Sequence, residues 1–150
     1  MKQGHLLWIK VWLSAVLWLI AAYAHAADPD FTKPLVYTVK GMTDVVPTRD
    51  ITYKTEDNTN LKMDAYAPRK LRKNASLPAV IFIHGGPIAK DQLAPTEWGI
   101  FKSYGQLAAA SGFVGITFNH RLNSQGDYGR SFSDVTAAIG HAIACKRIAC

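Results

Sequence analysis

Two short apolar runs, separated by a stretch with helical spacing, most constrain the fold of this 150-residue chain. Ala79–Ile83 (AVIFI) and Phe113–Phe118 (FVGITF) are apolar at consecutive positions, which is typical of strands covered on both faces in a parallel sheet. Residues 98–111 between them carry apolar side chains at helical spacing, and Gly112 stands where a left-handed C-terminal cap is expected. The sequence therefore predicts a right-handed strand–helix–strand crossover.

A β-hairpin is predicted before this unit. Asp50–Thr55 and Leu61–Ala67 alternate polar and apolar residues around Glu56–Asn60, a five-residue stretch of turn formers, and Pro68 ends the second strand. We expect one buried face and one solvated face on the second strand. The expected buried residues are Leu61, Met63 and Ala65, and the expected solvated ones are Lys62, Asp64 and Tyr66.

A second helix is predicted to open near Ser131, with Ser131 as its N-cap and Asp134 near the positive end of the helix dipole. The order is then hairpin, strand, helix, strand, helix, which is an α/β arrangement. Its apolar strands need neighbours on both edges, and the hairpin supplies only one. We therefore expect an incomplete sheet.

Residues 1–26 read as a secretory signal peptide. Lys2 and Lys10 precede or flank the apolar run Val11–Ala22, and Ala24–Ala26 supplies a small-x-small cleavage pattern. The apolar run is shorter than the roughly 20 residues of a membrane span, although an uncleaved anchor with interfacial tryptophans is the alternative. We expect a secreted or periplasmic protein without a stable membrane anchor after cleavage, with an extended lead-in at 27–49 and the folded portion at 50–150.

Charge and cysteine content exclude several function classes. Removing residues 1–26 leaves 15 of the 17 Lys and Arg with all 11 Asp and Glu, so the net charge falls from +6 to +4. Four cations crowd a proline-bounded loop without interleaved aromatics, which indicates a solvated loop and no nucleic acid partner; they are Arg69, Lys70, Arg72 and Lys73. Cys145 and Cys150 either form a disulfide or are unrelated thiols, and no metal or other cofactor is implied.

One motif carries chemistry: His84-Gly85-Gly86-Pro87, directly after the AVIFI strand. Glycines there allow a sharp turn and leave backbone N–H groups open to a ligand. Two such N–H groups stabilise a developing oxyanion during acyl transfer. Pro87 has no N–H, so the expected donors are Gly85, Gly86 and Ile88. The alternative is a plain tight turn.

The stretch from about Ile51 to Ile143 resembles the N-terminal half of the α/β-hydrolase fold, in its esterase and dienelactone-hydrolase-like branch. The resemblance lies in LKMDAYAP, AVIFIHGGP, FKSYGQLAAASGFVGITFNHRL and DVTAAIGHAI, in the family's order. His120 stands in a family Asn-Tyr-Arg-Leu motif in place of the tyrosine. The resemblance implies a three-layer sandwich, in which an antiparallel hairpin leads into a mostly parallel sheet flanked by helices.

The resemblance also implies site residues. Gly85 and Gly86 would form an oxyanion hole, with His84 supporting the loop through a hydrogen bond rather than acting as a base. His120 ends a strand at the edge where α/β sheets bind ligands, so it either contacts substrate or replaces a packing aromatic. Arg121 is expected to anchor a loop through Asp127 or Asp134.

The sequence departs from the family at the nucleophile. No Gly-x-Ser-x-Gly elbow occurs, and the nearest string, Gly129–Ser133, lacks the final glycine. Nucleophile, acid and base are therefore expected outside this chain. We interpret it as an N-terminal fragment, inactive alone, of an exported serine hydrolase acting on small-molecule carboxylic esters, with oligomeric state open. A prolyl-oligopeptidase-like peptidase, suggested by Pro after His-Gly-Gly, and a non-catalytic binding half-domain are the alternatives.

Overall fold

The computed structural model describes residues 30–70, 76–89, 91–122 and 124–144. Residues 31–150 form one compact unit. The predictions for the signal peptide, for Arg72 and Lys73, and for the two cysteines lie outside the described residues. Within the described residues no helix is both long and apolar enough to cross a membrane.

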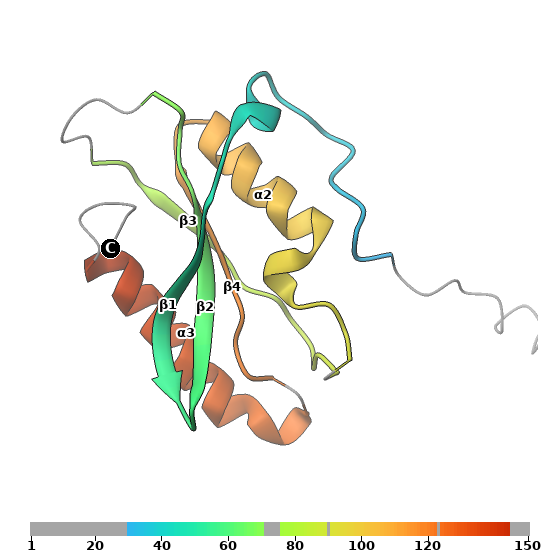
Figure 1. Ribbon diagram of the computed structural model, residues 1–150, viewed down its shortest axis with the longest axis vertical. Helices are drawn as coiled ribbons and strands as arrows, with labels where there is room; N and C mark the ends of the chain where they lie inside the picture. The colour runs from blue at the N-terminus through green and yellow to red at the C-terminus, as the bar shows by residue number, and fades with distance from the viewer. Residues whose placement is uncertain (1–29, 71–75, 90, 123, 145–150) are drawn as a thin grey trace, which may run out of the picture. The chain divides into compact units, whose positions relative to one another are not determined.

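Four strands form one mixed sheet with a helix on each face (Figure 1). The strands are β1 (Thr48–Glu56), β2 (Thr59–Tyr66), β3 (Ala79–Phe82) and β4 (Val114–Phe118), in the spatial order β1-β2-β4-β3. β1 pairs with β2 and β2 with β4 in antiparallel fashion, whereas β3 and β4 are parallel. Helix α2 (Gly99–Ala110) covers one face and α3 (Tyr128–Ala144) the other. The three-layer α/β arrangement is as expected.

The predicted crossover is β3–α2–β4. Helix α2 ends as the sequence indicates, because Gly112 adopts a left-handed φ of 91° and donates to the carbonyl of Ala109. The helix lies unusually close to β4. A Cβ built on Gly115 would come within 2.7 Å of the carbonyl oxygen of Gly105, so this contact requires glycine. Short 3₁₀ turns occupy Met42–Asp44, Pro95–Glu97 and Gln125–Asp127.

The hairpin turn is shorter than expected. β1 and β2 are joined by Asp57 and Asn58 alone, whose φ angles are 50° and 57°. Two consecutive left-handed residues match the type I′ turn of two-residue hairpins, and Asp and Asn tolerate that conformation. The prediction of a five-residue turn was wrong because Glu56 pairs with Thr59 and Thr55 with Asn60 in the ladder.

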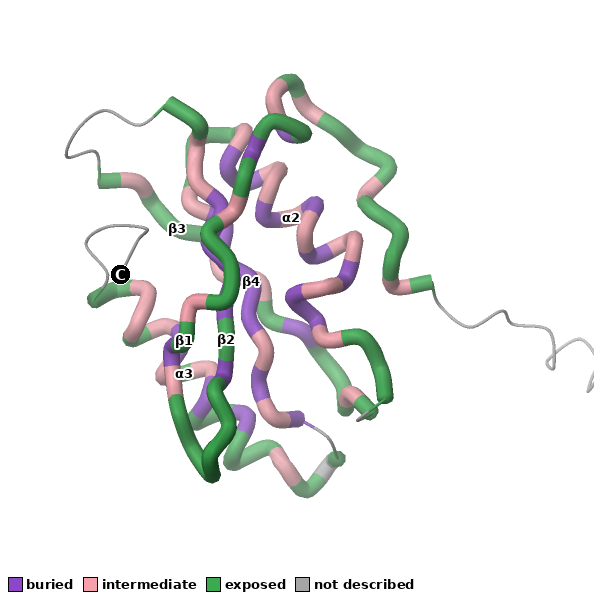
Figure 2. Tube along the Cα trace, viewed as in Figure 1, coloured by how far each residue is buried: buried purple, intermediate pink, exposed green. Residues whose placement is uncertain are grey.

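The face of β2 that we expected to be solvated is largely buried. Asp64 and Tyr66 are both less than 5% exposed, because α2 packs over that side of the sheet. Of the expected solvated residues only Lys62 is exposed. The opposite face carries the larger apolar cluster, to which α3 contributes Ala138. Figure 2 shows the buried positions running along β4 and at intervals along α2.

Helix α3 starts at Tyr128, three residues before the predicted cap. The capping box precedes it in the 3₁₀ turn, where Ser124 and Asp127 bond each other's backbone N–H groups. Ser131 therefore lies inside the helix, and Asp134 is buried rather than placed at the helix N-terminus. Both terminal roles predicted for these residues were wrong.

The two apolar runs differ in burial. β4 is buried as predicted, whereas β3 lies at the edge of the described sheet, where Val80 is 36% exposed and Ile83, just beyond the strand, is 50% exposed. The expectation that both runs are covered on both faces therefore fails for β3 within the described residues. The lead-in also differs from a purely extended segment: Met42 and Val45 are buried, and Phe31 stacks on Trp98.

Candidate functional site

The loops that follow β3 and β4 meet at the carboxyl ends of these parallel strands. Phe82 pairs with Thr117 in the register, so His84 and His120 emerge side by side. Their imidazole rings stack with centroids 3.7 Å apart and planes 8° apart. Both are buried, at 4% and 8% exposure. The structure thus brings together the two histidines that the sequence singled out separately.

His120 uses both of its ring nitrogens. Its Nε2 lies 3.2 Å from the carbonyl oxygen of His84, and its Nδ1 lies 2.9 Å from Oγ of Ser131 on α3. A carbonyl oxygen only accepts, so Nε2 carries the hydrogen. In the neutral ring Nδ1 is then an acceptor, and the Ser131 hydroxyl donates to it.

The environment holds this pair uncharged at neutral pH. Burial, followed by the neighbouring His120, lowers the pKa of His84 from 6.5 to about 4. Burial also lowers the pKa of His120. Neither ring nitrogen of His84 has a hydrogen-bond partner within the described part of the chain. Ring stacking on His120 and the hydrogen bond to the His84 carbonyl oxygen therefore hold His84 in place.

The loop from His84 to Ile88 is fixed at its other end as well. The Ile88 N–H donates to the carbonyl oxygen of Leu122 at 2.8 Å. The prediction that Ile88 is a free oxyanion donor was therefore wrong. Gly85 and Gly86 are exposed, and their N–H groups bond no other described residue. Gly86 has a φ of 74°, in the left-handed region that favours glycine.

The segment Asn119–Leu122 links four parts of the structure. The Asn119 amide exchanges two 3.0 Å hydrogen bonds with Thr96, which fixes the 3₁₀ turn before α2. His120 and Leu122 hold the two ends of the glycine loop. Arg121 turns the opposite way, toward α3 and the hairpin. This motif, which is part of one of the stretches that carried the family resemblance, therefore supports the glycine loop.

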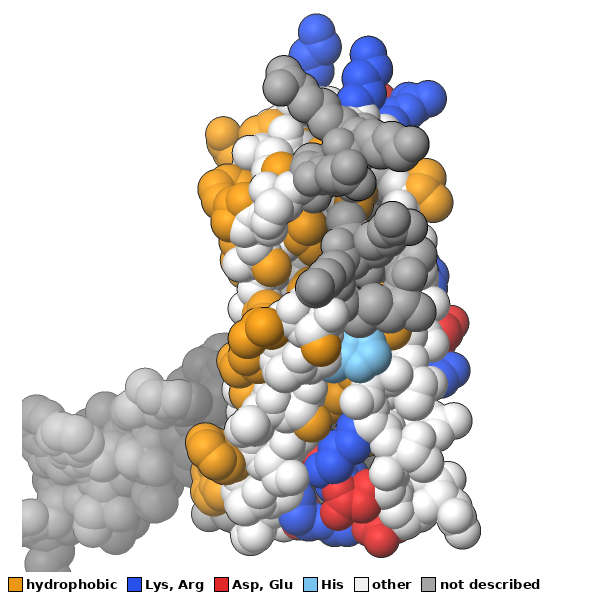
Figure 3. Space-filling model, turned by 90° about the vertical axis from the view of Figure 1, so that its left-hand side faces the viewer, with side chains coloured by type: hydrophobic (Ala, Val, Ile, Leu, Met, Phe, Trp, Pro, Cys, Tyr) orange, Lys and Arg blue, Asp and Glu red, His pale blue; other side chains and the backbone are white. Residues whose placement is uncertain are grey.

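Arg121 is paired with Asp134, one of the two carboxylates predicted for it. Its backbone N–H and side chain donate three hydrogen bonds of 2.8–3.0 Å to that carboxylate, and a fourth of 2.7 Å reaches Glu56. Burial alone would raise the pKa of Asp134, but hydrogen bonds from Arg121 and Lys54 outweigh it and lower that pKa to about 2. Acidic and basic side chains lie side by side at the end of the molecule that carries the hairpin turn, at the bottom of Figure 3.

Sequence reasoning missed the Ser131–His120 contact. The two residues are 11 positions apart, and no local motif links them. Ser131 is 8% exposed and points at Nδ1 of a buried ring, so it is not presented to a substrate as a nucleophile. Among the described residues no cluster of His, Cys, Asp and Glu has metal-binding geometry.

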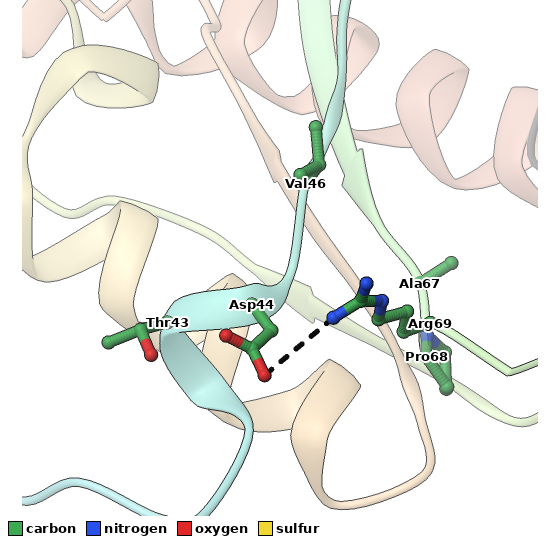
Figure 4. A pocket seen from close by; sticks show the side chains of 6 residues that line it. All are labelled: Thr43, Asp44, Val46, Ala67, Pro68 and Arg69. Carbon is green, nitrogen blue, oxygen red and sulfur yellow. Dashed lines mark ion pairs between the residues drawn. The ribbon is translucent and has the colours of Figure 1, made fainter.

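A surface cavity of about 530 Å³ lies elsewhere. Figure 4 shows it beside an ion pair in which Arg69 Nη1 lies 3.9 Å from Asp44 Oδ2. Its wall includes Ala67 and Pro68, just after the end of β2 that pairs with the start of β4. The cavity is thus at the amino ends of β3 and β4, opposite the glycine loop, and it is not part of the candidate site.

Comparison with known proteins identifies the fold. No family model and no curated protein matches the sequence. Among solved structures, brefeldin A esterase, a bacterial homologue of human hormone-sensitive lipase, matches with a TM-score of 0.58 and 16% identity, over 75% of this chain and 30% of that one. Esterase B from Lactobacillus rhamnosis matches with a TM-score of 0.51 and 22% identity, over 94% of this chain and 40% of that one.

The chain therefore spans 30% to 40% of the length of these solved esterases. At such identities the likeness shows the fold alone. The described residues have a partial α/β-hydrolase fold, as the sequence resemblance implied.

Proposed function

We propose that residues 84–88 are the oxyanion loop of an exported serine hydrolase that cleaves carboxylic esters. The observation that supports this most directly is that Gly85 and Gly86 are exposed residues whose N–H groups have no acceptor among the described residues. Hydrogen bonds at the His84 carbonyl oxygen and at the Ile88 N–H fix the two ends of the loop that carries them. Fixed backbone donors of this kind stabilise the negative charge that develops on a carbonyl oxygen during acyl transfer.

The reaction needs groups that these 150 residues do not offer in a recognisable motif. A serine would attack the ester carbonyl, a histidine would take the serine proton, and the alcohol would leave from the tetrahedral intermediate. Water would then release the acid from the acyl-enzyme. We place the nucleophile, its base and the acid in residues outside this chain, because the chain holds no Gly-x-Ser-x-Gly and spans 30% to 40% of the solved esterases it matches.

The test starts with the nucleotide sequence after the Cys150 codon. We expect a continuation, in one of the frames, that encodes a Gly-x-Ser-x-Gly elbow. The joined protein should hydrolyse short-chain p-nitrophenyl esters and tributyrin, since a tributyrin phosphonate inhibits esterase B in one of the solved structures. Absence of the elbow in every frame, or absence of ester hydrolysis by the joined protein, would contradict the proposal.

Two glycine variants of the joined protein probe the loop itself. Gly86→Ala forces a side chain onto a left-handed residue, so kcat should fall by about 10²–10³-fold, the usual effect of losing one oxyanion donor. Gly140→Ala is the matched control, because it lies in α3 with open space around it. Equal turnover in the two variants would remove the loop from the mechanism.

A peptidase of the prolyl-oligopeptidase type remains the second candidate, on the observation that Pro87 follows the glycines. Assays with aminoacyl p-nitroanilides alongside the esters separate the two. Faster cleavage of the amide substrates by the joined protein would favour the peptidase.

A non-catalytic half-domain is the third candidate, and it draws on the exposed edge at Val80 and Ile83. Unpaired strand edges invite association with another chain. Size-exclusion chromatography and thermal unfolding of residues 27–150 test it. A monomer that unfolds cooperatively would argue against a module that needs a partner strand.

A further inference from the structure

We propose that Ser131 and His120 position the oxyanion loop, with Ser131 holding the His120 ring whose Nε2–H fixes the His84 carbonyl and so directs the Gly85 N–H. That the loop binds an oxyanion rests on the proposed ester hydrolysis. The positioning itself rests on two contacts: Ser131 Oγ to His120 Nδ1 at 2.9 Å and His120 Nε2 to the His84 carbonyl oxygen at 3.2 Å.

The first step is the choice of tautomer. A neutral imidazole carries one hydrogen, on either Nδ1 or Nε2. Ser131 lies inside α3, where its hydroxyl is buried and faces Nδ1. The His84 carbonyl oxygen only accepts, so the hydrogen is on Nε2, and the Ser131 hydroxyl donates to Nδ1. Only that tautomer donates to the carbonyl oxygen of His84.

The second step is the geometry of one peptide unit. The carbonyl of His84 and the N–H of Gly85 belong to the same planar peptide group, and the described chain has no cis peptide bonds. In a trans peptide the C=O and N–H point in opposite directions. Holding the His84 carbonyl toward His120 therefore turns the Gly85 N–H away from His120. The hydrogen bond to the carbonyl thus aims an N–H donor at the opposite edge of the same peptide plane.

The third step is the rigidity of the surrounding structure. The stacked His84 ring packs on one face of His120, and Arg121, the next residue, is bonded to Asp134 on α3. Ser131 and Asp134 lie three residues apart on that helix, so α3 bonds His120 through Ser131 and Arg121 through Asp134. Ser131 accordingly acts at a distance from the loop, through His120, and is a positioning residue rather than a catalytic one.

The test is nuclear magnetic resonance of the full 150-residue chain labelled with ¹⁵N. Long-range ¹H–¹⁵N spectra report which ring nitrogen of each histidine carries a hydrogen. In the unmodified chain at about pH 7.5, His120 should be in the Nε2–H form. An Nδ1–H form there would overturn the proposal without any variant, so the test does not depend on a substituted chain remaining folded.

Variants then separate positioning from packing. Ser131→Ala removes the hydrogen bond to Nδ1, so it should shift the His120 Nδ1 resonance and shift or broaden the Gly85 amide resonance. Ser131→Thr, which restores a hydroxyl, should recover both signals. Ser133→Ala is the matched control, because its hydroxyl is exposed and bonds Lys54 instead. His120→Phe keeps a ring against His84 but removes both hydrogen bonds, so it should disturb the Gly85 amide as Ser131→Ala does.

The outcomes distinguish this proposal from the proposed function. An unchanged Gly85 amide in Ser131→Ala and in His120→Phe would refute the positioning role, even if the joined protein hydrolyses esters. The expected spectra, together with a joined protein that cleaves no ester, would leave the positioning intact and refute the hydrolase.

Discussion

The carboxylate of Asp134 receives three hydrogen bonds from Arg121, one from its backbone N–H at 3.0 Å and two from its guanidinium at 2.8 and 2.9 Å. Asp134 is fully buried, and the Arg121 side chain is 13% exposed. This contact joins the end of β4 to the middle of α3. Lys54 of β1 bonds the same carboxylate, so the hairpin is included in the connection.

Removing Arg121 should therefore destabilise the fold strongly. Arg121→Met leaves the buried Asp134 carboxylate with Lys54 as its remaining charged partner, and we expect a loss of about 3 kcal/mol in the free energy of unfolding. Urea denaturation followed by circular dichroism measures it. Arg130→Met is the control, because its ion pair with Asp57 is exposed and should contribute less than about 1 kcal/mol. Similar losses in the two variants would contradict the ranking.

The close approach of α2 to β4 makes a second prediction. Gly115→Ala places a methyl group against the backbone of Gly105, which cannot move without displacing the helix, so we expect a loss of about 3 kcal/mol. Gly140→Ala adds a methyl group in open space on α3 and should stabilise the chain by up to about 1 kcal/mol. Thermal unfolding compares them. A tolerated Gly115→Ala would mean that α2 is free to move away from the sheet.

The buried histidine pair predicts a pH dependence of stability. The pKa of His84 is about 4 in the folded chain and 6.5 in the unfolded chain, so the unfolded chain binds the proton more readily between these values. This contribution is fully present above pH 6.5 and is lost as the pH falls toward 4. Between pH 7 and pH 5 we expect the free energy of unfolding to decrease by about 2 kcal/mol.

His84→Phe isolates this effect, since the aromatic ring still stacks but does not titrate. Carboxylates titrate in both proteins, so the difference between the two stability–pH curves reports His84. Parallel curves from pH 7 to pH 5 would show that His84 is already accessible to protons in the folded state.

The 150-residue chain alone should not hydrolyse esters. It lacks an elbow serine, and Ser131, the serine bonded to a histidine, is buried and engaged with Nδ1. Purified residues 27–150 should release p-nitrophenol from p-nitrophenyl butyrate no faster than buffer does. Turnover that persists in Ser131→Ala and Ser133→Ala would contradict the missing-nucleophile interpretation.

The prediction that residues 1–26 are a cleaved export signal is tested by identifying the N-terminus of the exported chain. If signal peptidase cleaves after Ala26, the exported chain begins at Ala27, and intact mass spectrometry or N-terminal sequencing identifies that end. A chain that keeps Met1 and stays with the membrane fraction would instead support the uncleaved anchor.

Local signals predicted the parts of the fold that local forces decide. The apolar runs, the helix between them and the left-handed cap at Gly112 are all set by residues close in sequence. The hairpin turn was misjudged because every residue from Glu56 to Asn60 is a turn former, and strand pairing chose which two remained unpaired. Local preference alone could not make that choice.

The remaining errors have a tertiary cause. Asp64 and Tyr66 alternate as solvent-facing residues do, but Gly105 lets α2 lie against the Tyr66 ring and cover that face. Ser131 and Asp134 look like a helix start, yet the path of α3 brings them to His120 and Arg121. The glycines of the loop were predictable from their motif, whereas the contacts that fix the loop depend on how α3 crosses the sheet.

The two-residue turn at Asp57 and Asn58 has a consequence for the order in which the chain assembles. Its strands meet after the closure of a very short loop, an event of microseconds, whereas β3 and β4 meet only after the whole α2 connection is in place. We therefore expect the hairpin to form first, and the pairings of β4 with β2 and with β3 to wait for the longer connections between them. The glycine loop, which depends on the end of β4, is then among the last parts to take shape.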